Sequence, residues 1–207
     1  MEKKLIIFTG PSGVGKGTVE KPLFDDKDLK LKLSVSITTR KPREGEIDGV
    51  HYYFVSPEMF QTFIKEDRLL EYSKHFDNYY GTLLSEILHI YESGRIPFLE
   101  IETNGANQII EKYKKEGREA EICSIFLMPP SLDELERRIE GRKTETEDLI
   151  LKRLQKAREE IQMSSSFNYV ITNNSIEETV LNIKKIIKKD FAKMLEDNNK
   201  GEEGRKA

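Results

Sequence analysis

The sequence has little of several features that would point to particular classes of protein. It contains one cysteine, Cys123, in 207 residues, so no disulfide can form within the chain. Cys123 stands in an apolar run, and we interpret it as a buried, unreactive thiol. The longest apolar runs, such as 122–128, are far too short to cross a bilayer, and residues 1–4 lead into no signal-type apolar core. We therefore expect a cytoplasmic protein that does not associate with a membrane.

An excess of charge of one sign is also lacking. The formal net charge is -3, which gives no global basic field of the kind that nucleic-acid binders show. The three histidines share no metal-ligand spacing with one another or with Cys123. We expect small-molecule partners and no nucleic acid, and any phosphate must be bound by a local arrangement of residues.

What the sequence does contain is an alternation of short apolar runs and helical patterns. Such runs lie at 5–9, 96–101, 122–128 and 169–172. Each is followed by residues with helical periodicity, which predicts the α/β class with a parallel core sheet covered on both faces. The length allows one such domain with small inserted subdomains.

Two stretches interrupt this alternation. The first reads as a small mixed sheet with strands at 34–37, 51–55 and 69–76, and its helix begins with the capping pair Ser56-Pro57. That helix presents four apolar residues at helical spacing: Met59, Phe60, Phe63 and Ile64. The second stretch, 132–161, contains two charged helical segments that carry several arginines.

Residues 10–18 match G-x-x-x-x-G-K between a predicted strand and a predicted helix. Their glycines let successive N–H groups point into one concavity, the helix N-terminus adds a positive end, and the lysine supplies an ammonium. We therefore expect all nine residues to bind the phosphates of a nucleotide: Gly10, Pro11, Ser12, Gly13, Val14, Gly15, Lys16, Gly17 and Thr18.

Two positions in and after this loop depart from the usual pattern. Gly17 stands where a hydroxyl residue usually follows the lysine, which leaves Thr18 as the nearest hydroxyl for Mg²⁺. Pro22 lacks the N–H that would bond back within the helix, so we predict that this helix is short or kinked.

Many protein families have such a phosphate loop, and the inserted region indicates which of them this sequence resembles. The stretch from Thr38 to Val55, TTRKPREGEIDGVHYYFV, resembles the signature of guanylate kinases, and 78–82 (NYYGT) and 99–106 (LEIETNGA) are similar to further motifs of that family. The resemblance covers about residues 4–188. It implies a P-loop kinase fold with three layers and an ATP-dependent transfer of phosphate to GMP, and to dGMP, in purine metabolism and GMP recycling.

The resemblance also implies the acceptor site. The family's ligands of the GMP phosphate match Ser36, Arg40, Arg43, Tyr52 and Tyr80, and those of guanine match Glu71, Thr82 and Glu100. Two guanidinium forks suit a dianionic phosphate. Carboxylates facing guanine's N–H donors would meet adenine's lone pair unfavourably.

Further residues follow from the same resemblance. Lid arginines that close over the substrates match Arg142 and Arg153, with Arg138 beside them, and these join Lys16 and Arg40 as candidate catalytic residues. The family usually has a glycine where Lys143 stands, and this difference leaves open the geometry of the lid's hinge but not its chemistry. Asn173 matches a contact to adenine. Mg²⁺ is expected to be held mainly by ATP phosphates and water, with Thr18 and Glu102 near it.

We therefore predict one domain made of a core (1–33, 82–130 and 164–195), a GMP-binding subdomain (34–81), a lid (131–163) and a disordered tail (196–207). Two other functions stay open at this point. A catalytically inactive binding module would keep the fold but usually has a degraded phosphate loop, whereas Lys16 is present here. A kinase of the same fold acting on another nucleotide or a sugar phosphate is opposed by Glu71 and Glu100. The sequence leaves open whether the chain is a monomer or a homodimer.

Overall fold

The computed structural model describes residues 3–75, 77–140 and 147–196. Its core is a five-stranded parallel sheet in the order β2-β7-β1-β8-β9. The strands are β1 (Leu5–Thr9), β2 (Leu31–Leu33), β7 (Ile96–Glu100), β8 (Ile122–Met128) and β9 (Tyr169–Thr172). Four of them are the predicted runs. The fifth, β2, is a three-residue edge strand that sequence reasoning missed, because so short a run has no detectable period.

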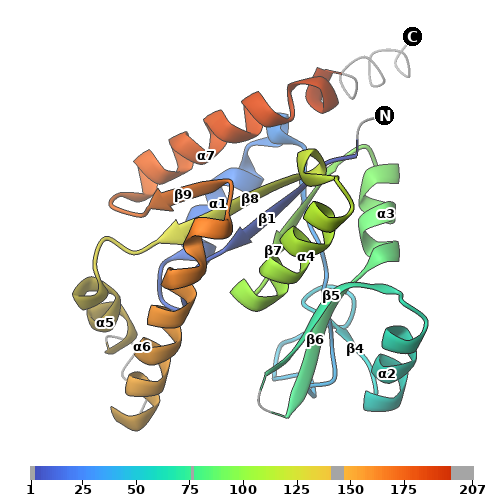
Figure 1. Ribbon diagram of the computed structural model, residues 1–207, viewed down its shortest axis with the longest axis horizontal. Helices are drawn as coiled ribbons and strands as arrows, with labels where there is room; N and C mark the ends of the chain where they lie inside the picture. The colour runs from blue at the N-terminus through green and yellow to red at the C-terminus, as the bar shows by residue number, and fades with distance from the viewer. Residues whose placement is uncertain (1–2, 76, 141–146, 197–207) are drawn as a thin grey trace.

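Helices cover both faces of this sheet, which confirms the three-layer prediction (Figure 1). One face packs on α1 (Lys16–Asp25), α5 (Leu132–Glu140), α6 (Glu147–Gln162) and α7 (Ile176–Asp190). The other face packs on α3 (Leu84–Glu92) and α4 (Thr103–Lys115). Strand β1 shows the two-sided burial directly, since Ile6 and Phe8 belong to one core cluster and Leu5 and Ile7 to the other.

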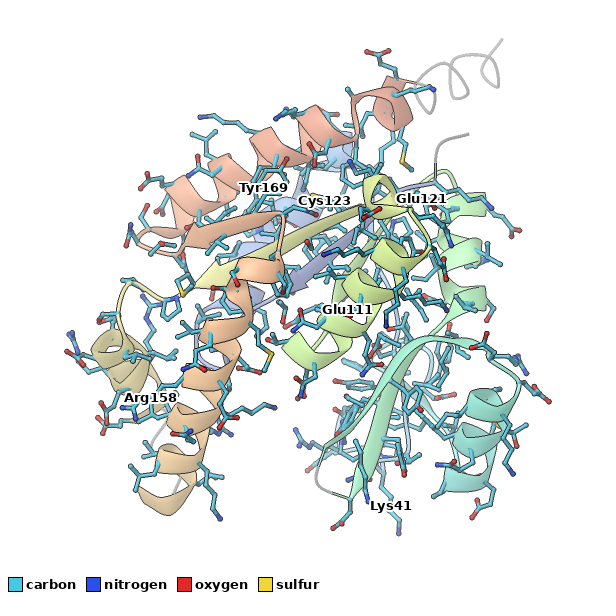
Figure 2. The ribbon with its side chains drawn as sticks, in the orientation of Figure 1. Lys41, Glu111, Glu121, Cys123, Arg158 and Tyr169 are labelled. Carbon is cyan, nitrogen blue, oxygen red and sulfur yellow. The ribbon has the colours of Figure 1, made fainter. Side chains whose placement is uncertain are left out.

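Short 3₁₀ turns complete the core: η1 (Lys27–Leu29), η2 (Glu119–Glu121) and η3 (Met163–Ser166). Helix α1 has 10 residues and ends three residues after Pro22, in agreement with the expected short helix. Cys123 is fully buried in β8 under α7, close to Tyr169 (Figure 2). Burial raises the pKa of its thiol, as expected for an unreactive cysteine.

A separate sheet in the order β4-β3-β6-β5 forms the inserted region. Its strands are β3 (Ile37–Thr38), β4 (Tyr53–Phe54), β5 (Leu69–His75) and β6 (Asn78–Leu83). The pairs β3–β6 and β5–β6 are antiparallel and β3–β4 is parallel, so the sheet is mixed as predicted. The strands predicted at 34–37 and 51–55 are reduced to two residues each, and β6 was not predicted. Because β6 continues to Leu83, the small sheet extends past residue 81.

Helix α2 (Pro57–Lys65) covers this sheet. It begins as predicted, with Ser56 Oγ accepting from the Met59 N–H at 3.2 Å. Phe60 is fully buried, but Met59 is 51% exposed and does not belong to the core face. Among the described residues, no helix is both long and apolar enough to span a membrane.

Candidate active site

The phosphate loop, 10–18, joins the carboxyl end of β1 to the first turn of α1. Gly13 and Gly15 have φ angles of 88° and 102°, a backbone region that residues with side chains rarely adopt. Lys16 folds back over the loop, and its Nζ donates to the Gly10 carbonyl at 2.7 Å. The loop therefore has the backbone shape that an anion cradle requires. At Gly17 an added Cβ would meet no atom within 4 Å, so packing does not require glycine there.

The back of the loop is fastened at the Val14 carbonyl. That oxygen accepts from Asn173 Nδ2 at 2.9 Å and from Arg138 Nη1 at 3.2 Å. Asn173 is buried, and its Oδ1 accepts from Thr179 Oγ1 at 3.0 Å. Both polar atoms of the Asn173 amide are thus engaged within the fold, and the side chain positions the loop rather than reaching freely into solvent.

Three cavities lie in this region, and residues of the loop line two of them. The first, of about 300 Å³, is lined by Gly10, Ser12 and Lys16 together with Arg153 of α6. The second, of about 220 Å³, lies under the small sheet, and its lining includes Ser36, Glu71 and Tyr80. These two cavities share four lining residues: Tyr52, Glu100, Ile101 and Glu102. The loop and the small sheet therefore face one continuous site at the carboxyl edge of the core sheet.

The third cavity, of about 480 Å³, opens on the other side of the loop. Its lining comprises Gly13, Gly15, Thr18, Arg138 and 173–176. An elongated ligand could therefore run from this cavity, across the loop, to the two cavities on the acceptor side.

Three of the nine loop residues that we expected to bind phosphate, Pro11, Val14 and Gly17, do not line these cavities. Pro11 is the clearest case. It has no N–H to donate to an anion, it is buried, and it is not among the residues that line these three cavities. Its carbonyl accepts from the Val14 N–H at 3.2 Å, which closes the turn at the start of the loop. The geometry therefore gives Pro11 a part in shaping the loop.

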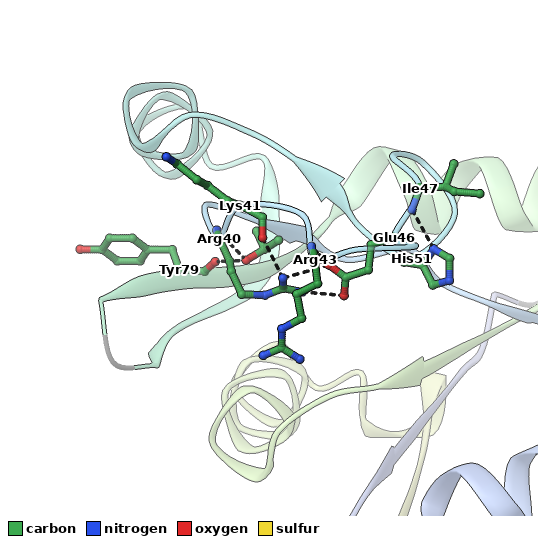
Figure 3. Close-up of polar contacts among 8 residues, drawn as sticks. Arg40, Lys41, Arg43, Glu46, Ile47, His51 and Tyr79 are labelled. Atoms are coloured by element: carbon green, nitrogen blue, oxygen red, sulfur yellow. Dashed lines mark hydrogen bonds and ion pairs between the residues drawn. The ribbon is translucent and has the colours of Figure 1, made fainter. Parts of the chain in front are cut away.

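Arg40 is held in a bidentate ion pair. Its Nη1 and Nη2 donate to the two carboxylate oxygens of Glu46 at 2.9 and 2.8 Å (Figure 3). Its guanidinium also lies over the ring of Tyr52, 5.5 Å from the ring centre. Glu46 also accepts from the Arg43 N–H at 2.7 Å. The hydrogen bonds from Arg40 and from the Arg43 backbone lower the pKa of Glu46 to about 2, so this carboxylate stays ionised.

The two threonines before Arg40 fix its place on the sheet. Thr38 Oγ1 donates to the Tyr79 carbonyl at 3.0 Å, and Thr39 Oγ1 accepts from the Tyr79 N–H at 2.9 Å. Arg43 is exposed, and its side chain turns away from Glu46 (Figure 3). In the same loop the Ile47 N–H donates to His51 Nδ1 at 3.0 Å, so His51 helps to hold the shape of this loop.

Glu71 is the most buried carboxyl of the acceptor side, with 6% of its surface exposed. Its Oε1 accepts from Thr82 Oγ1 at 2.7 Å across the β5–β6 pair. Burial raises the pKa of Glu71 to about 7, the Thr82 hydrogen bond opposes this shift, and the charge of Glu102 adds to it. The structure thus brings Glu71 and Thr82 together, as the sequence predicted, with Glu102 as their charged neighbour.

This raised pKa predicts a stability difference that can be measured. In the unfolded chain Glu71 ionises near pH 4.5, whereas in the folded chain it ionises near pH 7. The stabilisation of the folded state is therefore fully present below pH 4.5 and is lost as the pH rises through 7. We expect Glu71→Gln, which keeps the shape, to be more stable than the wild type at pH 8 by about 1–3 kcal/mol of unfolding free energy.

Thermal unfolding at pH 5 and pH 8 checks this. The two proteins should differ at pH 8 and converge at pH 5, whereas Glu92→Gln, at an exposed residue at the end of α3, should follow the wild type at both. Equal melting temperatures of the wild type and Glu71→Gln at pH 8 would show that the burial of Glu71 carries no such cost.

The two acids at the end of β7 have different neighbours. The charge of Glu102 acts on Glu71, and its Oε2 lies 3.2 Å from Lys156 Nζ. The charge of Glu100 acts on Glu20, a buried carboxyl one turn after Lys16 on α1, and on the hydroxyl of Tyr52. Burial raises the pKa of Glu20 to about 7, and Glu100 adds to the shift while Lys16 opposes it. Of the two acids, Glu102 is therefore the one whose charge acts on Glu71, and Glu100 the one whose charge acts on Glu20.

Helix α6 contributes residues that sequence reasoning missed. Arg153, which was predicted, lines the cavity above the loop together with Lys156 and Glu160, which were not. Glu160 is buried, which raises the pKa of its carboxyl, while Lys156 and Lys16 lower it. The spacing of these three positions places them on one face of a helix, and this polar stripe is the signal that could have revealed them. Arg142 and Lys143 lie outside the described residues, and so does most of the predicted tail.

Comparisons with known proteins agree with this arrangement. The family model described as guanylate kinase matches residues 2–190. A guanylate kinase of Mycoplasmopsis pulmonis is 52% identical over 188 residues, which cover 91% of this chain and 95% of the relative. One from Bacillus cereus is 48% identical over 183 residues, 88% of this chain and 86% of the relative. The crystal structure of a guanylate kinase from Anaplasma phagocytophilum superposes with a TM-score of 0.69 at 31% identity, covering 91% and 86% of the two chains.

Proposed function

The chain belongs to the guanylate kinase family and is an ATP:GMP phosphotransferase, and from this premise we propose which residues bind the two nucleotides and move the phosphoryl group. The observation that carries the proposal is the continuity of the two cavities through Tyr52, Glu100, Ile101 and Glu102. One of these cavities contains the phosphate loop and the other contains Glu71. A donor phosphate and an acceptor nucleotide bound there would meet at the shared wall.

The phosphate of GMP is proposed to bind between the two arginines of the signature and the cavity wall. Its ligands would be Ser36, Arg40, Arg43, Tyr52 and Tyr80. Ser36, Tyr52 and Tyr80 line the same cavity. The guanidinium of Arg40 lies over the Tyr52 ring and is oriented by its ion pair with Glu46. Both hydroxyls and guanidiniums donate to phosphate oxygens, so this set suits a dianion.

Guanine is proposed to bind over Glu71, with Thr82 holding that carboxylate. The resemblance assigned the second acid to Glu100, but the described contacts favour Glu102, because Glu102 is the acid whose charge reaches Glu71. We therefore propose Glu71 and Glu102 for guanine's N–H donors. Glu100, near Lys16 and Glu20, would then face the phosphates and the water shell of the metal.

ATP is proposed to bind with its phosphates in 10–18 and its nucleoside in the cavity lined by Arg138 and 173–176. In this proposal Asn173 acts by holding the Val14 carbonyl, and Pro11 by accepting from the Val14 N–H, so that the other loop N–H groups keep their orientation. Arg138 contacts the same Val14 carbonyl and lies close enough to the loop to shield phosphate charge.

The family acts with a divalent metal, and the donors near the loop fit Mg²⁺. Among the described residues no three acidic, histidine or cysteine side chains form a metal cage. Mg²⁺ commonly keeps several waters and uses one or two protein oxygens beside substrate phosphates. Thr18 and Glu100 are oxygen donors on the two sides of the loop. Bound with ATP, the ion would neutralise charge on the β- and γ-phosphates.

The reaction then needs positioning and charge neutralisation rather than a covalent nucleophile. A phosphate oxygen of GMP attacks the γ-phosphorus of ATP, and the bond to the β,γ-bridging oxygen breaks as the new bond forms. Lys16 and Arg153 lie in the cavity where the transferred group passes, and their cationic groups would stabilise its equatorial oxygens. Arg40 would hold the attacking phosphate in line.

The three-part division predicted from the sequence is retained as a proposal, with a core, a GMP-binding part (34–81) and a lid (131–163). The small sheet and the α5–α6 pair extend from the same end of the core (Figure 1). Both could therefore close over bound nucleotides. We place the activity in the cytoplasm, in purine nucleotide metabolism and GMP recycling, because its substrates are nucleotides of that compartment.

An acceptor panel tests the proposed specificity. Purified protein with ATP and Mg²⁺ is given GMP, dGMP, AMP, CMP or UMP separately, and ADP release is followed. We expect turnover with GMP and dGMP and at least about 10³-fold lower kcat/KM with AMP, because adenine would leave the buried Glu71 carboxylate without an N–H donor. A preference for AMP would contradict the roles given to Glu71 and Glu102.

A further inference from the structure

Gly105 occupies an unusual place on α4. It is the third residue of that helix and is buried. A Cβ added there would overlap Glu71 Oε2 and lie 3.1 Å from Glu71 Cδ. The carboxyl group of Glu71 therefore fills the space that any side chain at this position would take.

The other side of the same carboxyl is fixed by the small sheet. Thr82 Oγ1 donates to Oε1 at 2.7 Å, while Oε2 lies against Gly105. Glu71 is thus held between β6 of the inserted sheet and the first turn of a core helix. With 6% of its surface exposed, the group has little room to move aside.

One helical turn further, Gln108 fastens the backbone of β5 beside Glu71. Its Nε2 donates to the Tyr72 carbonyl at 2.8 Å, and its Oε1 accepts from the Tyr72 N–H at 3.3 Å. β5 is the edge strand of its sheet, so the Gln108 amide takes the two hydrogen bonds that a neighbouring strand would make. Residues 105 and 108 lie on the same face of α4.

From these contacts we propose that Gly105 and Gln108 are positioning residues for guanine recognition: Gly105 sets how deeply the Glu71 carboxylate sits, and Gln108 sets the register of β5 on α4. This inference rests on the proposed role of Glu71 toward guanine. Because α4 begins directly after Glu102, the same helix relates Glu71 to the second acid of the guanine site. The distance and orientation of the Glu71 and Glu102 carboxylates thus depend on how the inserted sheet packs on the core helix α4.

The consequence for Gly105→Ala is unusual for a glycine in a helix. Alanine favours the helix, so a purely local effect would leave the protein as stable as before or more so. Here the methyl group would push the Glu71 carboxylate out of line with guanine's N–H groups, and misplacement by about 1 Å can cost about 10²-fold. We expect KM for GMP to rise about 10- to 100-fold, with KM for ATP within about twofold of wild type.

A double-mutant cycle with Glu71→Ala separates this mechanism from general damage. Glu71→Ala removes the carboxyl that the new methyl would meet, so adding Gly105→Ala to it should change KM for GMP by less than about twofold. A wild-type KM for GMP in Gly105→Ala, or single effects that multiply in the double variant, would overturn the inference. If Glu71→Ala itself had a wild-type KM for GMP, the proposed role of Glu71 would be wrong and the inference would end with it.

Gln108 has a matched control in the preceding residue. Asn107 also links α4 to another element, since its Nδ2 donates to Met163 Sδ at 3.2 Å and its Oδ1 accepts from Ser166 Oγ at 2.7 Å, but it contacts η3 instead of β5. We expect Gln108→Ala to raise KM for GMP about three- to tenfold with little change in kcat, because exposed hydrogen bonds contribute modestly, and Asn107→Ala to leave KM for GMP unchanged. Equal values of KM for GMP in the two variants would contradict a specific role for Gln108.

Discussion

Lys16→Ala should lower kcat by about 10³-fold or more, because it removes the cation proposed to lie against the transferred phosphoryl group. In the structure the Lys16 ammonium lies over the loop, 2.7 Å from the Gly10 carbonyl, in the cavity that Arg153 also lines. No other described basic residue lies on the loop itself. Steady-state kinetics with saturating ATP, GMP and Mg²⁺ measure the loss, and KM for GMP should change far less than kcat.

Lys21→Ala is the matched control for this variant. Lys21 lies on the same helix and is exposed, so its loss should leave kcat within about twofold of wild type. The melting temperature of Lys16→Ala must also be compared, because Lys16 lowers the pKa of both Glu20 and Glu160. A folded Lys16→Ala protein with near-normal turnover would contradict the role given to the phosphate loop.

The parts of the fold that could be predicted are those with a local cause. The strand before the phosphate loop, the glycine positions in the loop and the Ser56 cap each follow from neighbouring residues. Strands β3 and β4 have two residues each, and they exist because of hydrogen bonds to partners far along the chain. Their limits could not be read from a period, and neither could the extent of β6.

The candidate site shows the same division between local and distant causes. A motif can place Glu100 and Glu102 at the end of a strand, but their different neighbours, Glu20 and Glu71, come from other elements. The Gln108 amide bonds a backbone 36 positions away in sequence. Such pairings depend on how α4 packs on β5, which follows from the folded core and not from residues near Gln108.

Arg40→Ala should abolish most use of GMP, with kcat/KM lowered by at least about 10³-fold. Its guanidinium is the charged group that both stacks on Tyr52 and is oriented by Glu46 in the acceptor site. Truncation removes a proposed ligand of the GMP phosphate. It also leaves the Glu46 carboxylate, whose pKa is about 2 with Arg40 present, without its ion-pair partner and facing a dianion. Arg68→Ala, in the same subdomain with a half-exposed side chain, should keep kcat/KM for GMP near wild type.

The Glu46 carboxylate that loses its partner in Arg40→Ala has an effect that can be measured separately from the loss of the Arg40 ligand. If the unpaired Glu46 repels the GMP phosphate, then Arg40→Ala combined with Glu46→Gln should recover kcat/KM about tenfold over Arg40→Ala alone. Glu46→Gln by itself should weaken GMP use moderately, because it loosens the bidentate hold on Arg40. A double variant no better than Arg40→Ala would show that Glu46 only orients Arg40. A single Arg40→Ala variant with near-normal kcat/KM would remove Arg40 from the acceptor site and shift the binding of the GMP phosphate to Arg43 and the two tyrosines.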